Sequence, residues 1–186
     1  ASDVYKRQAH IHIVACGTAM HAGLIGKRLI ERFSGIPVSV EIASEFRYSA
    51  PIVSENDLFI AISQSGETAD TLAALRLAKS LGMYTLSVVN VVGSSVARES
   101  DGVIYTCAGP EIAVASTKAY IVQLSVLYLL AAHFGLCRGR LSEREVSAFI
   151  SDLKSAAPDA VASVIAGAEE IKAAAETIKD AEDIFY

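Results

Sequence analysis

The hexapeptide SQSGET, residues 63–68, concentrates hydroxyl and amide side chains directly after an apolar run. Its three hydroxyls can each donate a hydrogen bond to a phosphoryl oxygen, and its glycine lets the main chain come close to a ligand. A helix that begins near Thr68 would add free N–H groups and a partial positive charge at the same point. The sequence therefore predicts a phosphate-binding loop whose ligand-binding residues are Ser63, Gln64, Ser65 and Thr68.

A helix cap is the simpler interpretation of the same residues. Ser65 or Thr68 could occupy the N-cap position, and the acidic residues Glu67 and Asp70 would favour the first helical turn. A cap uses only one hydroxyl, however, and it leaves the other two and Gln64 unexplained. An anion site at a helix N-terminus uses all of them, so phosphate binding is the favoured interpretation.

A second loop, Cys16-Gly17-Thr18-Ala19, follows another apolar run and precedes another helical pattern. Thr18 could donate to the same phosphate, and Gly17 would allow the tight turn. No base is fixed beside Cys16 by the sequence, so we expect a packed thiol at the end of a strand rather than a nucleophile.

Apolar strand patterns alternate five times with helical patterns, and the connections are short. This order predicts an α/β fold, a doubly wound five-stranded parallel sheet with helices on both faces, as in flavodoxin-like proteins. In such a fold, ligands bind beyond the carboxyl ends of the strands, where both loops would lie. The expected strands are 10–16, 36–43, 56–63, 83–90 and 102–107, and the main helices are 18–35, 68–82 and 116–135.

Apolar spacing in the first two of these helices predicts which side chains face the core. The expected inward residues are Leu24, Leu29, Ile30 and Phe33 in the first helix, and Leu72, Leu75 and Leu81 in the second. Beyond Gly139 the chain becomes alanine-rich and amphipathic, which predicts a helical C-terminal segment interrupted by Pro158.

Composition limits the classes of partner. A net charge of −5 lacks the basic footprint that nucleic-acid binding needs. The three cysteines form no CxxC pair, which favours a reduced, cytoplasmic setting. The apolar run 119–136 contains Gln123, Ser125 and His133, so we expect a buried helix and no membrane partner. Because 52% of the residues are hydrophobic, we also expect a homodimer.

Six segments, read in order, resemble the isomerase region of the glutamine–fructose-6-phosphate aminotransferases, which is built from sugar isomerase (SIS) domains. They are CGT, EIASEFRY, SQSGETADT, GSS, RESD and EIAVASTKA. The resemblance runs from about His10 to Leu136. It implies a SIS phosphosugar-binding domain in residues 10–138 and a helical connection toward a second SIS domain in residues 139–186. Residues 1–9 lie outside it, and we interpret them as a linker, tag or artefact.

The resemblance also implies a site for fructose-6-phosphate or glucosamine-6-phosphate. Gly17 and Thr18 would join the 63–68 loop around the phosphate, and the sugar would be lined by Val114, Ala115 and Ser116. Ala19 stands where these enzymes usually have serine, which removes one phosphate hydrogen bond and costs about 1 kcal/mol. No cofactor and no metal is expected.

The chemistry of these enzymes needs a glutaminase domain and a second SIS domain, so we expect this fragment to bind sugar phosphate with little or no synthase activity. Its own candidates for a general base are Glu67 and Glu111. Two alternatives remain open: a stand-alone aldose–ketose phosphosugar isomerase that uses Glu67 or Glu111, and a module that senses sugar phosphates.

Overall fold

The computed structural model describes residues 9–111 and 116–183. The chain divides into two compact units, one that ends at Glu143 and one that begins at Arg144. The first unit contains the sheet and the second is helical. Each unit is described by itself.

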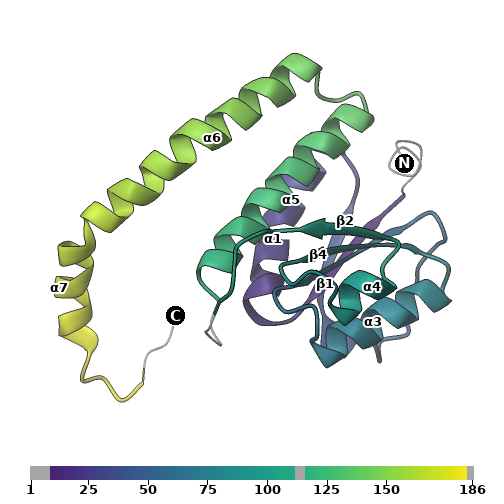
Figure 1. Cartoon of the computed structure of the whole chain (residues 1–186), viewed down its shortest axis with the longest axis horizontal. Helices are drawn as coiled ribbons and strands as arrows, with labels where there is room; N and C mark the ends of the chain where they lie inside the picture. The colour runs from purple at the N-terminus through teal and green to yellow at the C-terminus, as the bar shows by residue number, and fades with distance from the viewer. Residues whose placement is uncertain (1–8, 112–115, 184–186) are drawn as a thin grey trace. The chain divides into compact units, whose positions relative to one another are not determined.

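The first unit contains five parallel strands in the order β2-β1-β3-β4-β5 (Figure 1). The predicted five-stranded parallel sheet is therefore confirmed. Ala15 at the end of β1 pairs with Ile62 near the end of β3, so the two predicted ligand loops leave the sheet side by side. The strands are β1 Ile11–Ala15, β2 Val38–Ile42, β3 Leu58–Ser63, β4 Tyr84–Val89 and β5 Gly102–Tyr105.

Helices cover both faces of the sheet, as predicted. One face packs against α1 (Gly17–Ser34) and α5 (Lys118–Cys137), and the other against α2 (Ala43–Phe46), α3 (Ala69–Ser80) and α4 (Ser95–Glu99). Alternate strand residues feed these two cores because side chains along a strand point to opposite faces. In β3, for example, Leu58, Ile60 and Ile62 join the first core, while Phe59 and Ala61 join the second.

Small residues form the closest contacts of α1. A Cβ atom added at Gly23 would lie 2.9 Å from Ile13 Cγ2, and one added at Gly26 would lie 2.9 Å from Leu127 Cδ1. The helix therefore packs tightly on the sheet and on α5 through glycine. Leu24 is 43% exposed, so its predicted inward position is wrong.

Of the other residues predicted to face the core, five are buried or partly buried and one is exposed. Ile30 and Leu75 are completely buried, and Leu29, Phe33 and Leu72 are partly buried against the cores. Leu81 is 41% exposed because α3 has already ended there and Leu81 occupies the C-cap position. The prediction for Leu81 is wrong.

Among the described helices, α5 alone is long and apolar enough to cross a membrane by length and composition. In this fold, one side of α5 packs into the core, where Leu127 and Phe134 are completely buried. Ile121 and Leu129 are exposed. The predicted burial is thus confirmed for the side that faces α1 and the sheet.

The second unit contains α7 (Ala168–Ile178) and all of α6 (Glu143–Ala166) except its first residue. Pro158 lies inside α6, so the predicted interruption at this residue is wrong. Proline removes one backbone hydrogen bond, and the remaining turns continue the helix. The break comes at Gly167, the N-cap of α7.

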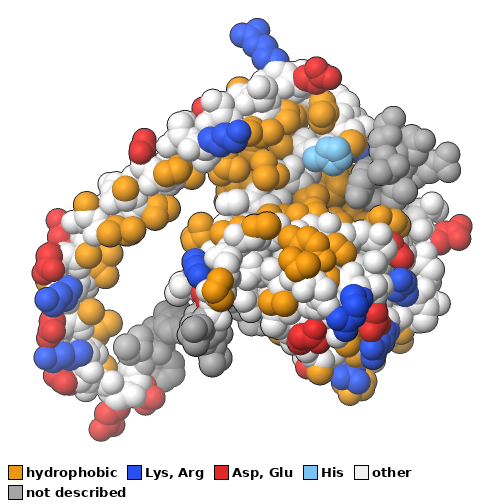
Figure 2. Space-filling view, viewed as in Figure 1, with side chains coloured by type: hydrophobic (Ala, Val, Ile, Leu, Met, Phe, Trp, Pro, Cys, Tyr) orange, Lys and Arg blue, Asp and Glu red, His pale blue; other side chains and the backbone are white. Residues whose placement is uncertain are grey.

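Neither α6 nor α7 contains a buried residue. Figure 2 shows the hydrophobic side chains of α7 on one side and its charged side chains on the other. This segment is therefore amphipathic, as predicted. Its large exposed apolar residues are Val161, Val164, Ile165, Ile171 and Ile178.

Candidate ligand-binding site

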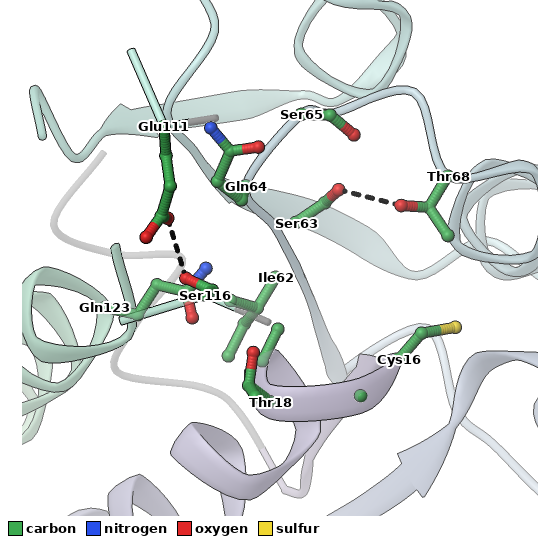
Figure 3. A pocket seen from close by; sticks show the side chains of 12 residues that line it. Cys16, Thr18, Ile62, Ser63, Gln64, Ser65, Thr68, Glu111, Ser116 and Gln123 are labelled. Carbon is green, nitrogen blue, oxygen red and sulfur yellow. Dashed lines mark hydrogen bonds between the residues drawn. The ribbon is translucent and has the colours of Figure 1, made fainter. Parts of the chain in front are cut away.

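A pocket of about 220 Å³ opens at the carboxyl edge of the sheet, where β1 and β3 end (Figure 3). Three parts of the chain line it: the β1–α1 loop, the β3–α3 loop, and the segment that leads into α5. All the described residues that the sequence predicts to bind phosphate lie in this one pocket. The lining residues are Cys16, Gly17, Thr18, Ala19, Ile62, Ser63, Gln64, Ser65, Thr68, Glu111, Ser116 and Gln123.

Two helix N-termini meet at the pocket. Cys16 is the N-cap of α1 and Thr68 is the N-cap of α3, and neither helix receives a side-chain capping bond. The first N–H groups of each helix lack an intrahelical acceptor and carry a partial positive charge. Thr68 thus has the position that the capping interpretation predicted, but its hydroxyl does not cap the helix. Both N-termini can receive an anion.

Hydrogen bonds within the β3–α3 loop hold its shape. The Ser63 hydroxyl oxygen accepts the Gly66 N–H at 3.0 Å, and it lies 3.2 Å from the Thr68 hydroxyl oxygen. The Ser65 hydroxyl accepts the Glu67 N–H at 3.2 Å. Ser63 is 4% exposed, so this part of the loop is firmly packed. The loop presents hydroxyls in a fixed arrangement.

The β4–α4 loop and the first turn of α4 hold the β3–α3 loop on its other side. The Asn90 N–H donates to the Gln64 carbonyl at 3.1 Å, and the Val96 N–H donates to the Gly66 carbonyl at 2.9 Å. Gly66 has a φ of +65°, and a Cβ atom there would lie 2.6 Å from Ser94 Cβ. Glycine at position 66 is thus required by the backbone conformation and by the neighbouring side chain.

Glu67 takes part in these contacts and lies outside the lining of the pocket. Its carboxylate accepts the Ser95 N–H at 2.7 Å, and this backbone hydrogen bond lowers the pKa of Glu67. Its position does not support the predicted role as a base. The sequence carries no signal for this, because a glutamate just before a helix can point either way.

Glu111 lines the pocket and ties the β5–α5 segment to the start of α5. Its carboxylate accepts the Thr117 N–H at 2.8 Å and the Ser116 hydroxyl at 2.9 Å. The backbone bond from Thr117, followed by smaller contributions from Ser116, lowers the pKa of Glu111. The group is therefore ionised near neutral pH and serves as an acceptor.

The predicted sugar-binding residues are only partly described. Ser116 lines the pocket beside Glu111. Val114 and Ala115 lie outside the described residues. The nearby cation Lys118 donates from Nζ to the Pro110 carbonyl at 2.6 Å and does not line the pocket.

Charge in the pocket is sparse. Among its described lining residues, Glu111 is the single charged side chain. An anion would therefore be held by neutral hydroxyls, main-chain N–H groups and helix dipoles. In the described parts of the chain, no group of three or more His, Cys, Asp or Glu side chains could hold a metal ion.

Gln123, on α5, is the polar lining residue that the sequence analysis did not assign to the site. It is 2% exposed, and its Oε1 atom has no hydrogen-bond partner among the described residues. The available signal was a single amide in a long apolar helix. Buried polar groups are normally paired, so an amide in that place points to a partner that the fold does not supply.

Comparison with known families matches residues 4–133 to a model described as SIS domain, which is more than half of the chain. The chain belongs to the SIS domain family. The predicted family is thus confirmed, and its five-stranded parallel sheet agrees with the fold described above.

Curated relatives of this SIS domain carry the name glutamine–fructose-6-phosphate aminotransferase (isomerizing). The protein from Symbiobacterium thermophilum is 54% identical over 95% of this chain. That from Caldanaerobacter subterraneus subsp. tengcongensis is 56% identical over 95% of it. In both cases the match covers 29% of the relative, so this chain spans under a third of their length.

A solved structure is similar over nearly the whole chain. It is the C-terminal domain of glucosamine-fructose-6-phosphate aminotransferase from Francisella tularensis, with a TM-score of 0.92 and 39% identity. The match covers 96% of this chain and 50% of that one. The likeness therefore includes the helical C-terminal segment as well as most of the sheet.

Proposed function

We propose that this SIS domain binds a phosphorylated hexose, fructose-6-phosphate or glucosamine-6-phosphate, as the phosphosugar-binding part of an isomerizing glutamine–fructose-6-phosphate aminotransferase. One observation carries the proposal. Two uncapped helix N-termini, those of α1 and α3, meet three serine and threonine hydroxyls of the 63–68 loop at one end of one pocket. The names of the aminotransferase relatives support the choice of ligand.

The phosphate would lie against the 63–68 loop. Ser65 and Thr68 would donate hydroxyl hydrogen bonds to its oxygens, and the first N–H groups of α3 would add donors aligned with the helix dipole. Thr18 and the first turn of α1 would approach from the neighbouring strand. Hydrogen bonds to a charged acceptor are about twice as strong as neutral ones, so such a site needs no lysine or arginine.

The ionised Glu111 supports a binding role over a stand-alone isomerase. A general base works best when its pKa lies near the working pH. The hydrogen bonds from Thr117 and Ser116 lower the pKa of Glu111, away from neutral pH. Each carboxylate oxygen also already accepts one of these hydrogen bonds. We therefore propose that this chain alone binds sugar phosphate without converting it. Its cytoplasmic location and its homodimer stay predictions.

The test is calorimetric titration of the 186-residue chain with glucosamine-6-phosphate. Ser65→Ala should weaken binding on the order of tenfold or more, because one hydrogen bond to a charged group is lost. Ser80→Ala is the matched control: it removes an exposed hydroxyl at the far end of α3, where the side chain bonds only to the Leu77 carbonyl. Equal affinities of wild type and Ser65→Ala, or equal losses in both variants, would refute the phosphate site.

A further inference from the structure

The two ends of the pocket differ in hydrogen-bond character. The end formed by residues 63–68 offers hydroxyls and main-chain N–H groups, which can donate. The opposite side carries the carboxylate of Glu111, which accepts, and the side-chain amide of Gln123, whose buried oxygen can accept once the amide turns it toward the pocket. Figure 3 shows Gln123 beside Ser116, across the pocket from Ser65 and Thr68. A ligand that matched both ends would carry acceptors at one end and donors at the other.

Gln123 is an unusual residue for its position. It sits in α5 among apolar residues and is 2% exposed, and its Oε1 atom is buried without a partner among the described residues. Leaving a buried acceptor unpaired costs free energy, whereas an apolar side chain of the same length would cost none. The described residues therefore give this amide oxygen no hydrogen bond that would stabilise the ligand-free domain.

A ligand can supply the missing hydrogen. The terminal torsion of glutamine is broad, so the amide can turn its oxygen toward the pocket without leaving its rotamer. The dianionic phosphoryl group of a sugar phosphate has no hydrogen to donate, and when it is held by the 63–68 loop it lies at the other end of the pocket, so it does not satisfy this oxygen. A hydroxyl or an ammonium group on the remainder of the ligand can.

We propose that Gln123 is a specificity-determining residue whose amide oxygen accepts a hydrogen bond from a sugar hydroxyl, so that the pocket favours phosphorylated polyols over phosphate alone. This inference rests on the proposed phosphate site and adds the feature that recognises the rest of the ligand. Recognition of a hydroxyl by a buried polar group discriminates strongly, because a ligand that lacks the hydroxyl leaves that group unpaired.

The experiment compares wild type with Gln123→Met, which keeps the length of the side chain and suits a helix but removes the amide. Three quantities are measured on the 186-residue chain: the Tm without ligand, the affinity for fructose-6-phosphate and the affinity for inorganic phosphate. We expect an unchanged Tm or one raised by about 2–4 °C, because an unpaired buried acceptor is removed. Affinity for fructose-6-phosphate should fall about tenfold, while affinity for inorganic phosphate stays within about twofold.

Ser125→Ala is the control on the same helix. Its hydroxyl bonds to the Ile121 carbonyl within α5, so all three quantities should stay at the wild-type values. A Gln123→Met protein that fails to fold or melts at a lower temperature would overturn the inference, because the amide would then serve the ligand-free fold.

Two further outcomes separate this inference from the proposed function. If Ser65→Ala weakens fructose-6-phosphate binding but Gln123→Met does not, the phosphate site stands and the role of Gln123 is refuted. If wild type binds neither ligand, both proposals are refuted.

Discussion

The two sides of the pocket are built differently. The 63–68 loop is closed by its own hydrogen bonds and held on its other side by the β4–α4 loop and the first turn of α4. The opposite side depends on one carboxylate, Glu111, and on one amide, Gln123, that has hydrogen-bonding capacity to spare. The difference fits the two proposed tasks: a doubly charged group needs rigid donors, whereas discrimination among hydroxyls needs an acceptor that the described fold leaves unpaired, as it does the Gln123 amide oxygen.

Breaking the rigid side should have the largest effect. Gly66→Ala would place a Cβ against the buried Ser94 and would strain a backbone at φ +65°. We expect a loss on the order of 3 kcal/mol in the free energy of unfolding, measured by urea denaturation, and a loss of phosphate binding.

Gly93→Ala separates strain from crowding. Gly93 has a similar φ of +73°, but a Cβ there meets nothing within 4 Å. The free energy of unfolding of this variant should be lower than that of wild type by only about 1 kcal/mol. If both variants lost the same amount, the close contact between Gly66 and Ser94 would have no energetic role.

The acceptor side can be tested by pH. Hydrogen bonds from Thr117 and Ser116 lower the pKa of Glu111 in the folded chain. The unfolded chain therefore binds a proton at Glu111 more readily than the folded chain does. Ionised Glu111 thus stabilises the fold at pH values above the ordinary glutamate pKa, and this stabilisation is lost as the pH falls through the pKa of Glu111 in the folded chain. Glu111→Gln should have a lower Tm than wild type at pH 7, and the difference should shrink as the pH drops below about 4.

Glu55→Gln, which alters an exposed carboxylate, is the control for that series. Its Tm should follow wild type across the same pH range. A Glu111→Gln deficit that stayed constant with pH would mean that shape, and not charge, holds the start of α5.

The smallest effect is expected from adding a donor to the phosphate end. Ala19 lines the pocket in the first turn of α1 and is 7% exposed. Ala19→Ser should tighten phosphate binding about fivefold, which corresponds to one added hydrogen bond of about 1 kcal/mol. Ala22→Ser, one turn further into the buried face of α1, should bring no gain in affinity. Titration of both variants with inorganic phosphate decides whether the predicted gap at position 19 exists.

Sequence predicted the sheet and the location of the pocket because both follow from local patterns. Apolar runs that end in Gly17 and in the 63–68 loop mark strand ends, and parallel strands bring their carboxyl ends to one edge. The membership of Ser63, Ser65 and Thr68 in one pocket follows from that geometry.

The misses depend on packing that no local pattern encodes. Leu24 is exposed because Gly23 and Gly26 give α1 a closer approach to its neighbours than leucine could. Gln123 reaches the pocket only because α5, from far along the chain, packs beside α1, whose N-terminus lies at the same pocket. Pro158 was expected to interrupt the C-terminal helical segment, but it removes only one hydrogen bond among the many that hold α6.

The absence of buried residues in α6 and α7 has a thermodynamic consequence. Helices without tertiary burial unwind gradually from their ends, whereas the sheet and its covering helices lose structure in one cooperative step. On heating, the circular dichroism at 222 nm should therefore show a sigmoidal transition from the sheet and its covering helices. A gradual loss of signal from residues 144–178 should be superimposed on it. Amide hydrogens of the same residues should exchange with deuterium long before those of β1 and β3.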